Sequence, residues 1–258
     1  MLKVIDMDIL VYIIGGILAG VATGLIGLSA ATILAPLFAT FLGIPVYTAI
    51  GIALASDIFA SAISTYNYYI HKNIKLRKAL LFSITVITFT IVGSYFSKDM
   101  NPYNLNSIIN IMVLLLGLRF IVFPVKSKKD NVLFRKRKLI IVQTLFFGVL
   151  IGMINGYFGA GGGLSMLAVL TMILHYDIKT AVGTSVLIMT VTAFVGASTH
   201  IVIGGTNWIA LVITSFSALI GANIASKYAN KINEVTLNRI IGGLLIIYGT
   251  SLLLVYYI

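Results

Sequence analysis

The sequence predicts an all-α integral membrane protein made of two inverted repeats. Of its 258 residues, 59% are hydrophobic and only 10% are charged, whereas about a quarter of a soluble domain is charged. Residues 9–56, 79–97, 100–118, 139–176, 180–226 and 240–258 lack Asp, Glu, Lys and Arg, and about 20 apolar residues cross a bilayer as a helix. This composition excludes a soluble enzyme, a disordered chain and, because cysteine is absent, a secreted disulfide scaffold.

Each repeat is expected to contain five helical segments, because the apolar runs lack the alternation of β-barrel strands. The segments cover about 9–27, 29–43, 46–70, 77–97 and 104–124 in the first repeat, and 139–158, 162–174, 178–203, 208–227 and 236–257 in the second. The second segment of each repeat is short and follows a glycine cluster. The sequence is compatible with three forms of this second segment: a half-helix, an arm of a re-entrant hairpin or a steep short span.

An internal duplication relates the two halves of the chain at a fixed offset of 132 residues. Gly16, Gly20, Gly24 and Gly27 align with Gly148, Gly152, Gly156 and Gly159, and residues 48–51 align with 180–183. The register holds from about residue 15 to the C-terminus, which chance glycine matches do not explain. Residues 1–125 are therefore interpreted as the first membrane repeat, 126–138 as a basic cytoplasmic linker and 139–258 as the second repeat, in one domain overall.

The basic residues predict how the repeats are oriented. If each repeat crosses the membrane an odd number of times, 16 of the 18 Lys and Arg residues share one face, which the positive-inside rule makes cytoplasmic. Both termini then lie outside, and the two repeats are antiparallel. If the first two segments of each repeat form a re-entrant hairpin, the number of crossings per repeat is still odd. Ten spans, and six spans with two hairpins, therefore both fit the distribution of charges. The net charge of +11 then reflects cytoplasmic loops and not nucleic-acid binding.

Antiparallel repeats are typical of secondary transporters, which bind their substrate between the repeats, near the middle of the membrane, where helices are broken. The sequence has no Walker A or HExxH motif and no recognisable Ser-His-Asp arrangement, so we expect neither an enzyme nor a cofactor or metal site. An anion channel, an intramembrane enzyme and a scaffold are the alternatives, although the loops are short for a scaffold.

Glycine clusters are expected to break the chain after the first segment of each repeat. Repeat two has three consecutive glycines at 161–163, where repeat one has Ser-Ala-Ala at 29–31. Freed backbone N–H groups must find partners inside a membrane, so such a break lines a cavity. A helix that starts there directs its N–H groups and its positive dipole end at the cavity, which favours an anion. Gly16, Gly20, Gly148 and Gly152 are instead interpreted as helix-packing positions.

The glycine-rich start of each repeat, the Gly159-Ala160-Gly161-Gly162-Gly163 run, Pro36 and the Ala181-Val182-Gly183-Thr184-Ser185 element resemble the TauE/SafE family of sulfite exporters, also called the toluene sulfonate uptake permease family. The resemblance covers about residues 10–257. It implies a multi-pass transporter of the prokaryotic plasma membrane that exports a small anion, such as sulfite, thiosulfate or an organosulfonate, by alternating access. Repeat one departs from the family pattern at 29–31 and at 52–53, so unequal roles of the repeats are expected.

The candidate anion site lies between the repeats, in segments that contain no Lys or Arg. It comprises backbone and side-chain groups of Asn155, Gly159, Gly161, Gly162, Gly163, Ser165, Thr184 and Ser185 in repeat two, and of Thr23, Gly27, Ser29 and Thr32 in repeat one. Amides, hydroxyls and helix dipoles are thus the expected donors. Repeat two should dominate because Ala30 and Ala31 carry methyl groups, and Gly162→Val should fill the approach of the anion.

Two residues within the spans are candidates for proton coupling. Asp57 is the only acid well inside a span, where an ionised carboxylate costs about 2.5–3.5 kcal/mol. It either exchanges protons or is a structural hydrogen-bond partner of Ser56, Ser61 or a neighbouring helix. Its counterpart in repeat two is Met189, so the coupling would be asymmetric. His200 is the second candidate, with a buried neutral histidine as the alternative. The expected partners are the anion, lipid and protons, and nothing indicates an oligomer.

Overall fold

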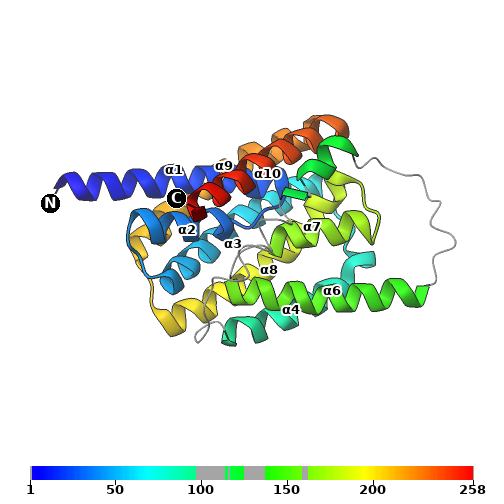
Figure 1. Cartoon of the computed structure of the whole chain (residues 1–258), viewed down its shortest axis with the longest axis horizontal. Helices are drawn as coiled ribbons and strands as arrows, with labels where there is room; N and C mark the ends of the chain where they lie inside the picture. Colours follow the sequence, from blue (N-terminus) through cyan, green and yellow to red (C-terminus); the bar gives the residue numbers. More distant parts are fainter. Residues whose placement is uncertain (1, 97–113, 116, 125–136, 159–161, 258) are drawn as a thin grey trace.

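Helices make up the regular structure of the described part of the chain (Figure 1). The computed structural model describes residues 2–96, 114–115, 117–124, 137–158 and 162–257. The helices are α1 (Leu2–Ile26), α2 (Ala31–Phe41), α3 (Val46–Ile70), α4 (Leu76–Phe96), α6 (Arg137–Phe158), α7 (Gly162–Met172), α8 (Ile178–Gly204), α9 (Trp208–Lys231) and α10 (Glu234–Tyr257). Residues 117–122 are also helical, inside the predicted segment 104–124. Most of the predicted linker lies outside the described residues.

The all-helical membrane fold predicted from the sequence is confirmed. Among the residues that the structure describes, five helices, α1, α3, α4, α8 and α9, hold apolar stretches long enough to cross a membrane. Helices α2 and α7 have 11 residues each, and a rise of 1.5 Å per residue makes them about 16 Å long, roughly half of the hydrocarbon thickness. Neither α2 nor α7 is therefore long enough to cross the hydrocarbon core as a helix by itself.

The starts of the helices differ in how their free N–H groups are satisfied. Helix α8 follows Asp177, whose carboxylate accepts from the Thr180 N–H at 2.9 Å, and α9 follows Asn207, whose side chain accepts from the Ala210 N–H at 3.1 Å. These are ordinary N-caps. Helix α2 follows Ala30 and has no side-chain cap from that residue. The Ala31 N–H instead donates to the Ser29 hydroxyl at 3.3 Å, and the Thr32 N–H donates to the Ser29 carbonyl oxygen at 3.0 Å.

An antiparallel pair of helices, α3 and α8, runs through the centre of the molecule. Close contacts along the pair join Gly51 to His200 near the start of α3 and Gly183 to Tyr68 near its end. Helix α1 lies along α9, and α4 lies along α6, on either side of this pair (Figure 1). Helices α3 and α8 therefore run antiparallel along their contact.

The duplication recurs in the packing of the helices. A Cβ atom added at Gly20 in α1 would meet the Ala218 carbonyl oxygen of α9, and one added at Gly152 in α6 would meet the Val86 carbonyl oxygen of α4. Gly152 follows Gly20 by 132 residues, and Ala218 follows Val86 by the same offset. The α1–α9 and α4–α6 pairs are therefore built alike, and glycine is needed where the backbones touch.

Replacement of Gly20 by alanine is expected to destabilise the protein, because the added methyl group would overlap the backbone of Ala218 and not a movable side chain. Overpacking of this kind costs about 1–3 kcal/mol. Gly243→Ala is the matched control, because a Cβ there meets nothing within 4 Å in a helix that alanine favours. Thermal unfolding in detergent should show a lower midpoint for Gly20→Ala only; equal midpoints would contradict the close helix contact.

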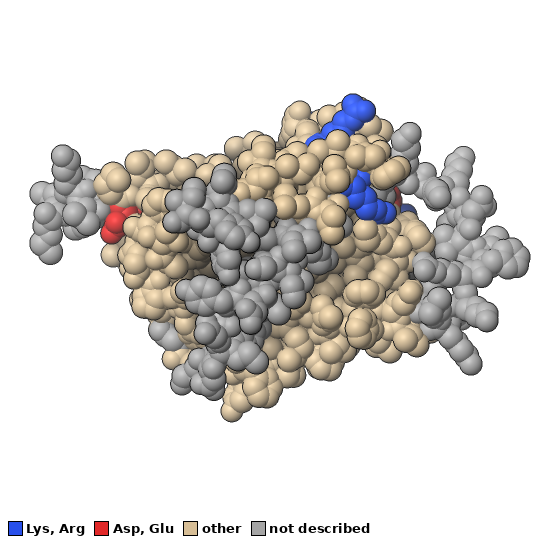
Figure 2. Space-filling view, in the orientation of Figure 1, with Lys and Arg blue, Asp and Glu red and all other residues tan. Residues whose placement is uncertain are grey.

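The outer surface is apolar, as expected for contact with lipid. The view in Figure 2 shows a broad band without charge, with the described Lys and Arg side chains gathered at one end. Large hydrophobic side chains such as Phe194, Phe216 and Ile224 are more than half exposed. Polar side chains, in contrast, are buried between the helices, for example Asp57, Asn67 and His200. Apolar side chains outside and polar side chains inside are the distribution expected of a membrane protein.

Candidate transport site

The chain breaks between α1 and α2, inside the protein. Gly27 has φ = +72°, which a residue with a side chain adopts only with strain. Thr23, in the last turn of α1, holds the break, because its hydroxyl lies 2.8 Å from the Leu28 carbonyl oxygen and 3.0 Å from that of Ala19. Thr23 and Ser29 are both buried, as is Thr32 in the first turn of α2. The expected break in repeat one is thus present.

The Asp57 carboxylate of α3 binds the residues that lead into α2. Its carboxylate accepts from the Ser29 hydroxyl at 2.7 Å and lies 3.4 Å from the Thr23 hydroxyl, and the Ala30 backbone N–H bonds to it as well. The side chain is only 1% exposed. A negative charge at this place stabilises a helix N-terminus. The Ser29 hydroxyl and the Ala30 N–H thus donate to one buried carboxylate from a different helix, and the Thr23 hydroxyl lies close to it.

The partners of Asp57 differ from the two serines expected for a structural role. The Ser61 hydroxyl donates to the backbone carbonyl of Asp57 at 2.6 Å, and the Ser56 hydroxyl donates to that of Ile52 at 3.0 Å. Both serines therefore satisfy their own helix, as hydroxyls in membrane helices usually do. The partners of the Asp57 carboxylate lie instead in a neighbouring element, the break between α1 and α2.

The start of α7 lies against the first break. Gly159 and Gly161 fall outside the described residues, and α7 begins at Gly162. A Cβ added at Gly163 would meet the Gly27 carbonyl oxygen, the Ser29 backbone nitrogen at 2.9 Å and the Met189 sulfur at 2.8 Å. Met189 is the repeat counterpart of Asp57. The two half-helices thus begin next to each other, with a carboxylate beside one start and a thioether beside the other.

Some of the remaining candidate residues of repeat two lie at the centre where the two half-helices begin, and others lie elsewhere. Asn155 lies directly against Gly162, and the Ser185 hydroxyl is 2.5 Å from a Cβ built on Gly27, so both face the breaks. Ser165 is buried in the first turn of α7. The Thr184 hydroxyl instead accepts from the Lys75 backbone N–H at 3.3 Å, in the connection between α3 and α4. Thr184 therefore lies away from the centre.

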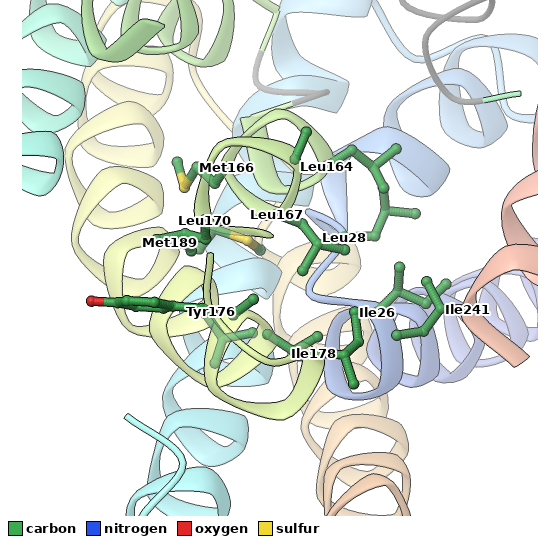
Figure 3. Close-up of a cluster of buried hydrophobic side chains, with 14 of the residues drawn as sticks. Ile26, Leu28, Leu164, Met166, Leu167, Leu170, Tyr176, Ile178, Met189 and Ile241 are labelled. Atoms are coloured by element: carbon green, nitrogen blue, oxygen red, sulfur yellow. The ribbon is translucent and has the colours of Figure 1, made fainter. Parts of the chain in front are cut away.

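Apolar side chains surround the meeting point of the two half-helices. Figure 3 shows Leu28 from the first break facing Leu164 and Leu167 of α7, with Met189 of α8 on the other side of that helix. All four are at most 2% exposed. Because such surroundings have a low dielectric constant, the amides and hydroxyls at the breaks interact more strongly with a charge than they would in water.

Two other features lie away from this centre. His200 is fully buried eleven positions beyond Met189 on α8, which puts it about 16 Å further along the helix. It stacks on Tyr47, with ring centroids 4.2 Å apart, a contact that sequence reasoning missed. A hollow of about 580 Å³ lies beside the second half of α3, lined mainly by apolar residues with Thr65, Tyr66 and Tyr69. None of the break residues lines it, so it is not the candidate site.

A model of the sulfite exporter TauE/SafE family matches residues 12–252, nearly the whole chain. The protein belongs to the TauE/SafE family. Its curated relatives include the probable membrane transporter proteins YunE and YdhB of Bacillus subtilis and MJ0441 of Methanocaldococcus jannaschii.

The TauE/SafE relatives match over most of their length. YunE is 24% identical over 96% of this chain and 98% of its own, YdhB is 26% identical over 87% and 91%, and MJ0441 is 28% identical over 89% and 91%. No solved structure matches this TauE/SafE chain. The relatives are named as membrane transporters, and the resemblance predicted from the sequence is confirmed.

Proposed function

We propose that this TauE/SafE protein is a secondary transporter that moves a small anion by alternating access. The observation that carries the proposal is the meeting of two half-helix starts between the repeats, where Gly163 of α7 lies against Gly27 and Ser29 of the first break. Broken helices between antiparallel repeats are where secondary transporters bind their substrates. Rocking of one repeat against the other would expose this place to each side in turn.

A small oxyanion suits the groups that surround the proposed site. The segments that form it contain no Lys or Arg, so the donors are backbone N–H groups, hydroxyls and the positive ends of two helix dipoles. The Ser185 hydroxyl donates to the Val182 carbonyl oxygen at 2.9 Å and would turn from it to bind an anion. Each dipole contributes about 0.3–1 kcal/mol, and up to about 2 kcal/mol in a partly buried site. Several such donors give micromolar to millimolar binding, which permits release. Sulfite, thiosulfate and organosulfonates fit this description, and the family description supports sulfite export.

Proton coupling through Asp57 follows from its place at the start of α2. An ionised Asp57 repels a nearby anion and also occupies Ser29 and the Ala30 N–H, whereas a protonated Asp57 releases them. The anion and a proton are therefore carried together. If the anion is divalent, the pair carries one net negative charge, and an inside-negative potential of 100 mV favours its exit by about 2.3 kcal/mol. The mechanism is thus compatible with export.

Flux through the purified protein in proteoliposomes tests this function and its alternatives. We expect saturable uptake of labelled sulfite or thiosulfate that is accelerated by unlabelled anion on the opposite side. A channel would show no such acceleration, because conduction does not require the protein to return with bound substrate. An intramembrane enzyme would change the chemical identity of the anion, which chromatography of the vesicle contents detects.

We further propose that the protein lies in a prokaryotic plasma membrane with both termini outside and the 126–138 linker in the cytoplasm. The support is the distribution of the 16 basic residues under the positive-inside rule. Asp130→Cys introduces the only cysteine of the chain, so a membrane-impermeant thiol reagent should label it in opened cells and not in intact cells. Labelling of intact cells would overturn the orientation.

A further inference from the structure

The hollow of about 580 Å³ beside the second half of α3 is not used by the proposed anion site. Its lining comes from three elements. Ala62 and Tyr66 belong to α3, Ile74 and Leu76 lie where α4 begins, and Leu187 belongs to α8. Ligand sites in proteins have volumes of about 300–1,000 Å³, so the hollow is large enough to hold a ligand of its own.

The hollow opens on the lipid-facing surface of α3. Tyr66 is 60% exposed and Tyr69 is 69% exposed, and Ala62 is exposed as well. Tyrosines near the end of a membrane helix are typical of the interface between lipid and water. From Tyr69 back to Ala62, at 1.5 Å per residue, the hollow extends about 10 Å along α3 into the hydrocarbon. An acyl chain is the ligand expected at this depth.

Basic residues lie at the end of the hollow where α3 leads into α4. The connection carries Lys72, Lys75 and Arg77, and all three side chains are exposed. Lys75 stands between the two lining residues Ile74 and Leu76. Positive side chains at the water-facing end of an apolar hollow suit a lipid with a negative headgroup, because the phosphate and the acyl chain then both find partners.

The backbone of this connection is held by neighbouring helices. The Tyr176 hydroxyl donates to the Lys75 carbonyl oxygen at 2.7 Å, and the Lys75 N–H donates to the Thr184 hydroxyl at 3.3 Å. The Asn73 side chain donates to the Asn230 side-chain oxygen at 2.7 Å. The basic side chains therefore extend from a fixed backbone, which lowers the entropy lost when they bind a ligand.

The turn itself does not require these positive charges. Lys72 has φ = +60°, a conformation that glycine adopts without strain and lysine does not. Its counterpart in repeat two, 132 positions later, is Gly204, and the equivalent connection, residues 203–209, contains no charged residue. A strained lysine in place of glycine indicates a use for its side chain beyond the turn. The acid Asp177 lies beside Tyr176 in the chain, but its carboxylate caps α8.

We propose that the hollow, together with Lys72, Lys75 and Arg77, is a binding site for an anionic phospholipid. One acyl chain lies in the hollow along α3, and the basic side chains bind the phosphate of the headgroup. Because Leu187 belongs to α8, the lipid contacts both repeats. The site does not depend on the proposed anion transport.

Quenching of tryptophan fluorescence by brominated acyl chains locates such a lipid. The chain has one tryptophan, so in a Trp208→Phe background Tyr66→Trp places a single reporter in the lining of the hollow. Phe194→Trp is the matched control, because Phe194 is 62% exposed, as Tyr66 is 60% exposed, and does not line the hollow. Each variant is placed in nanodiscs of phosphatidylcholine with phosphatidylglycerol as the minor lipid, and the bromine is carried by one lipid or the other.

The preference for phosphatidylglycerol is its quenching per mole divided by that of phosphatidylcholine. We expect a preference of at least about fivefold at Tyr66→Trp, the effect of one basic residue near an anionic headgroup, and none at Phe194→Trp. Lys72→Gln with Lys75→Gln should remove the preference. Lys227→Gln with Lys231→Gln, which takes the same charge from exposed positions of α9, should leave it unchanged.

Ala62→Phe tests the acyl chain separately from the headgroup. Ala62 is exposed and lines the hollow, and its counterpart in repeat two is Phe194, so a phenyl ring is accepted at this position of the repeat. The ring should fill the hollow and lower the quenching at Tyr66→Trp by phosphatidylglycerol. If this variant does not fold, Ala62→Leu replaces it with the same expected result.

Equal quenching per mole by the two lipids at Tyr66→Trp, or a preference that survives the loss of Lys72 and Lys75, would overturn the proposal. A preference of the same size at Phe194→Trp would also overturn it, because it would show general attraction of anionic lipid to a basic protein. Absence of quenching by either lipid at Tyr66→Trp would assign the hollow to another occupant, such as a second copy of the chain, and would count against the lipid site.

Discussion

Asp57→Asn is expected to abolish the driving of anion flux by a proton gradient while the protein still folds. Asparagine keeps the shape of the carboxylate and can accept from Ser29, but it cannot bind and release a proton. A gradient of one pH unit is worth about 1.4 kcal/mol per proton, so one coupled proton accumulates the anion about tenfold on the alkaline side. In the variant this accumulation should vanish, with passive exchange retained.

Ser61→Ala is the control for this experiment. It removes a hydroxyl one turn further along α3, one that donates to the Asp57 backbone carbonyl and not to the carboxylate. Gradient-driven accumulation should therefore persist in Ser61→Ala. If Asp57→Asn accumulated the anion as strongly as the unmodified protein, Asp57 would be no more than the structural cap of α2.

Gly163→Ala is expected to reduce the rate of transport at least tenfold. The added methyl group would meet the Gly27 carbonyl oxygen and the Ser29 nitrogen, which belong to the backbone of the opposite repeat. Backbone atoms cannot turn aside as a side chain can, so the two half-helix starts must separate. A displacement of about 1 Å in a binding constellation is enough to cost about a hundredfold in rate. Initial rates of sulfite or thiosulfate exchange provide the measurement.

Gly148→Ala separates this effect from a general loss of packing. A Cβ there would come within 2.9 Å of the Thr85 side chain, in the contact between α6 and α4 and away from the breaks. We expect Gly148→Ala to lower the unfolding midpoint with little change in exchange rate once the amount of folded protein is matched. Similar losses of exchange in both variants would show that Gly163 has no special place in the site.

Much of this fold can be predicted from the positions of charged residues and glycines. A chain that must hide its backbone from lipid has few options other than helices, so uncharged runs locate the helices closely. The offset of 132 residues also predicts which helices are equivalent, and the contacts of Gly20 and Gly152 follow it. The breaks are visible because glycine is the residue that a sharp turn such as Gly27 requires.

The site is harder to predict because it depends on how each helix is rotated. Thr184 and Ser185 are neighbours in sequence, yet Ser185 lies beside Gly27 and Thr184 contacts the backbone of Lys75. Neighbours on a helix point about 100° apart, and α8 is apolar on most of its surface, so no pattern reveals which one faces the centre.

Contacts between distant segments cannot be predicted from the sequence for the same reason. The pairing of Asp57 with Ser29 joins α3 to the first break, whereas sequence proximity favours Ser56 and Ser61. Gly162, which the sequence marks as the position where a side chain would block the anion, lies against Asn155 of its own repeat. Gly163, the next residue, is the one that touches the opposite repeat.

The most direct test of the central claim is a cryo-electron microscopy structure of the protein in nanodiscs with saturating thiosulfate. The account predicts density for one anion between the repeats, in contact with the start of α7 and within reach of the Ser185 hydroxyl and the break at Gly27. Density in another place, such as the hollow lined by Tyr66 and Tyr69, in a sample that transports thiosulfate would contradict it.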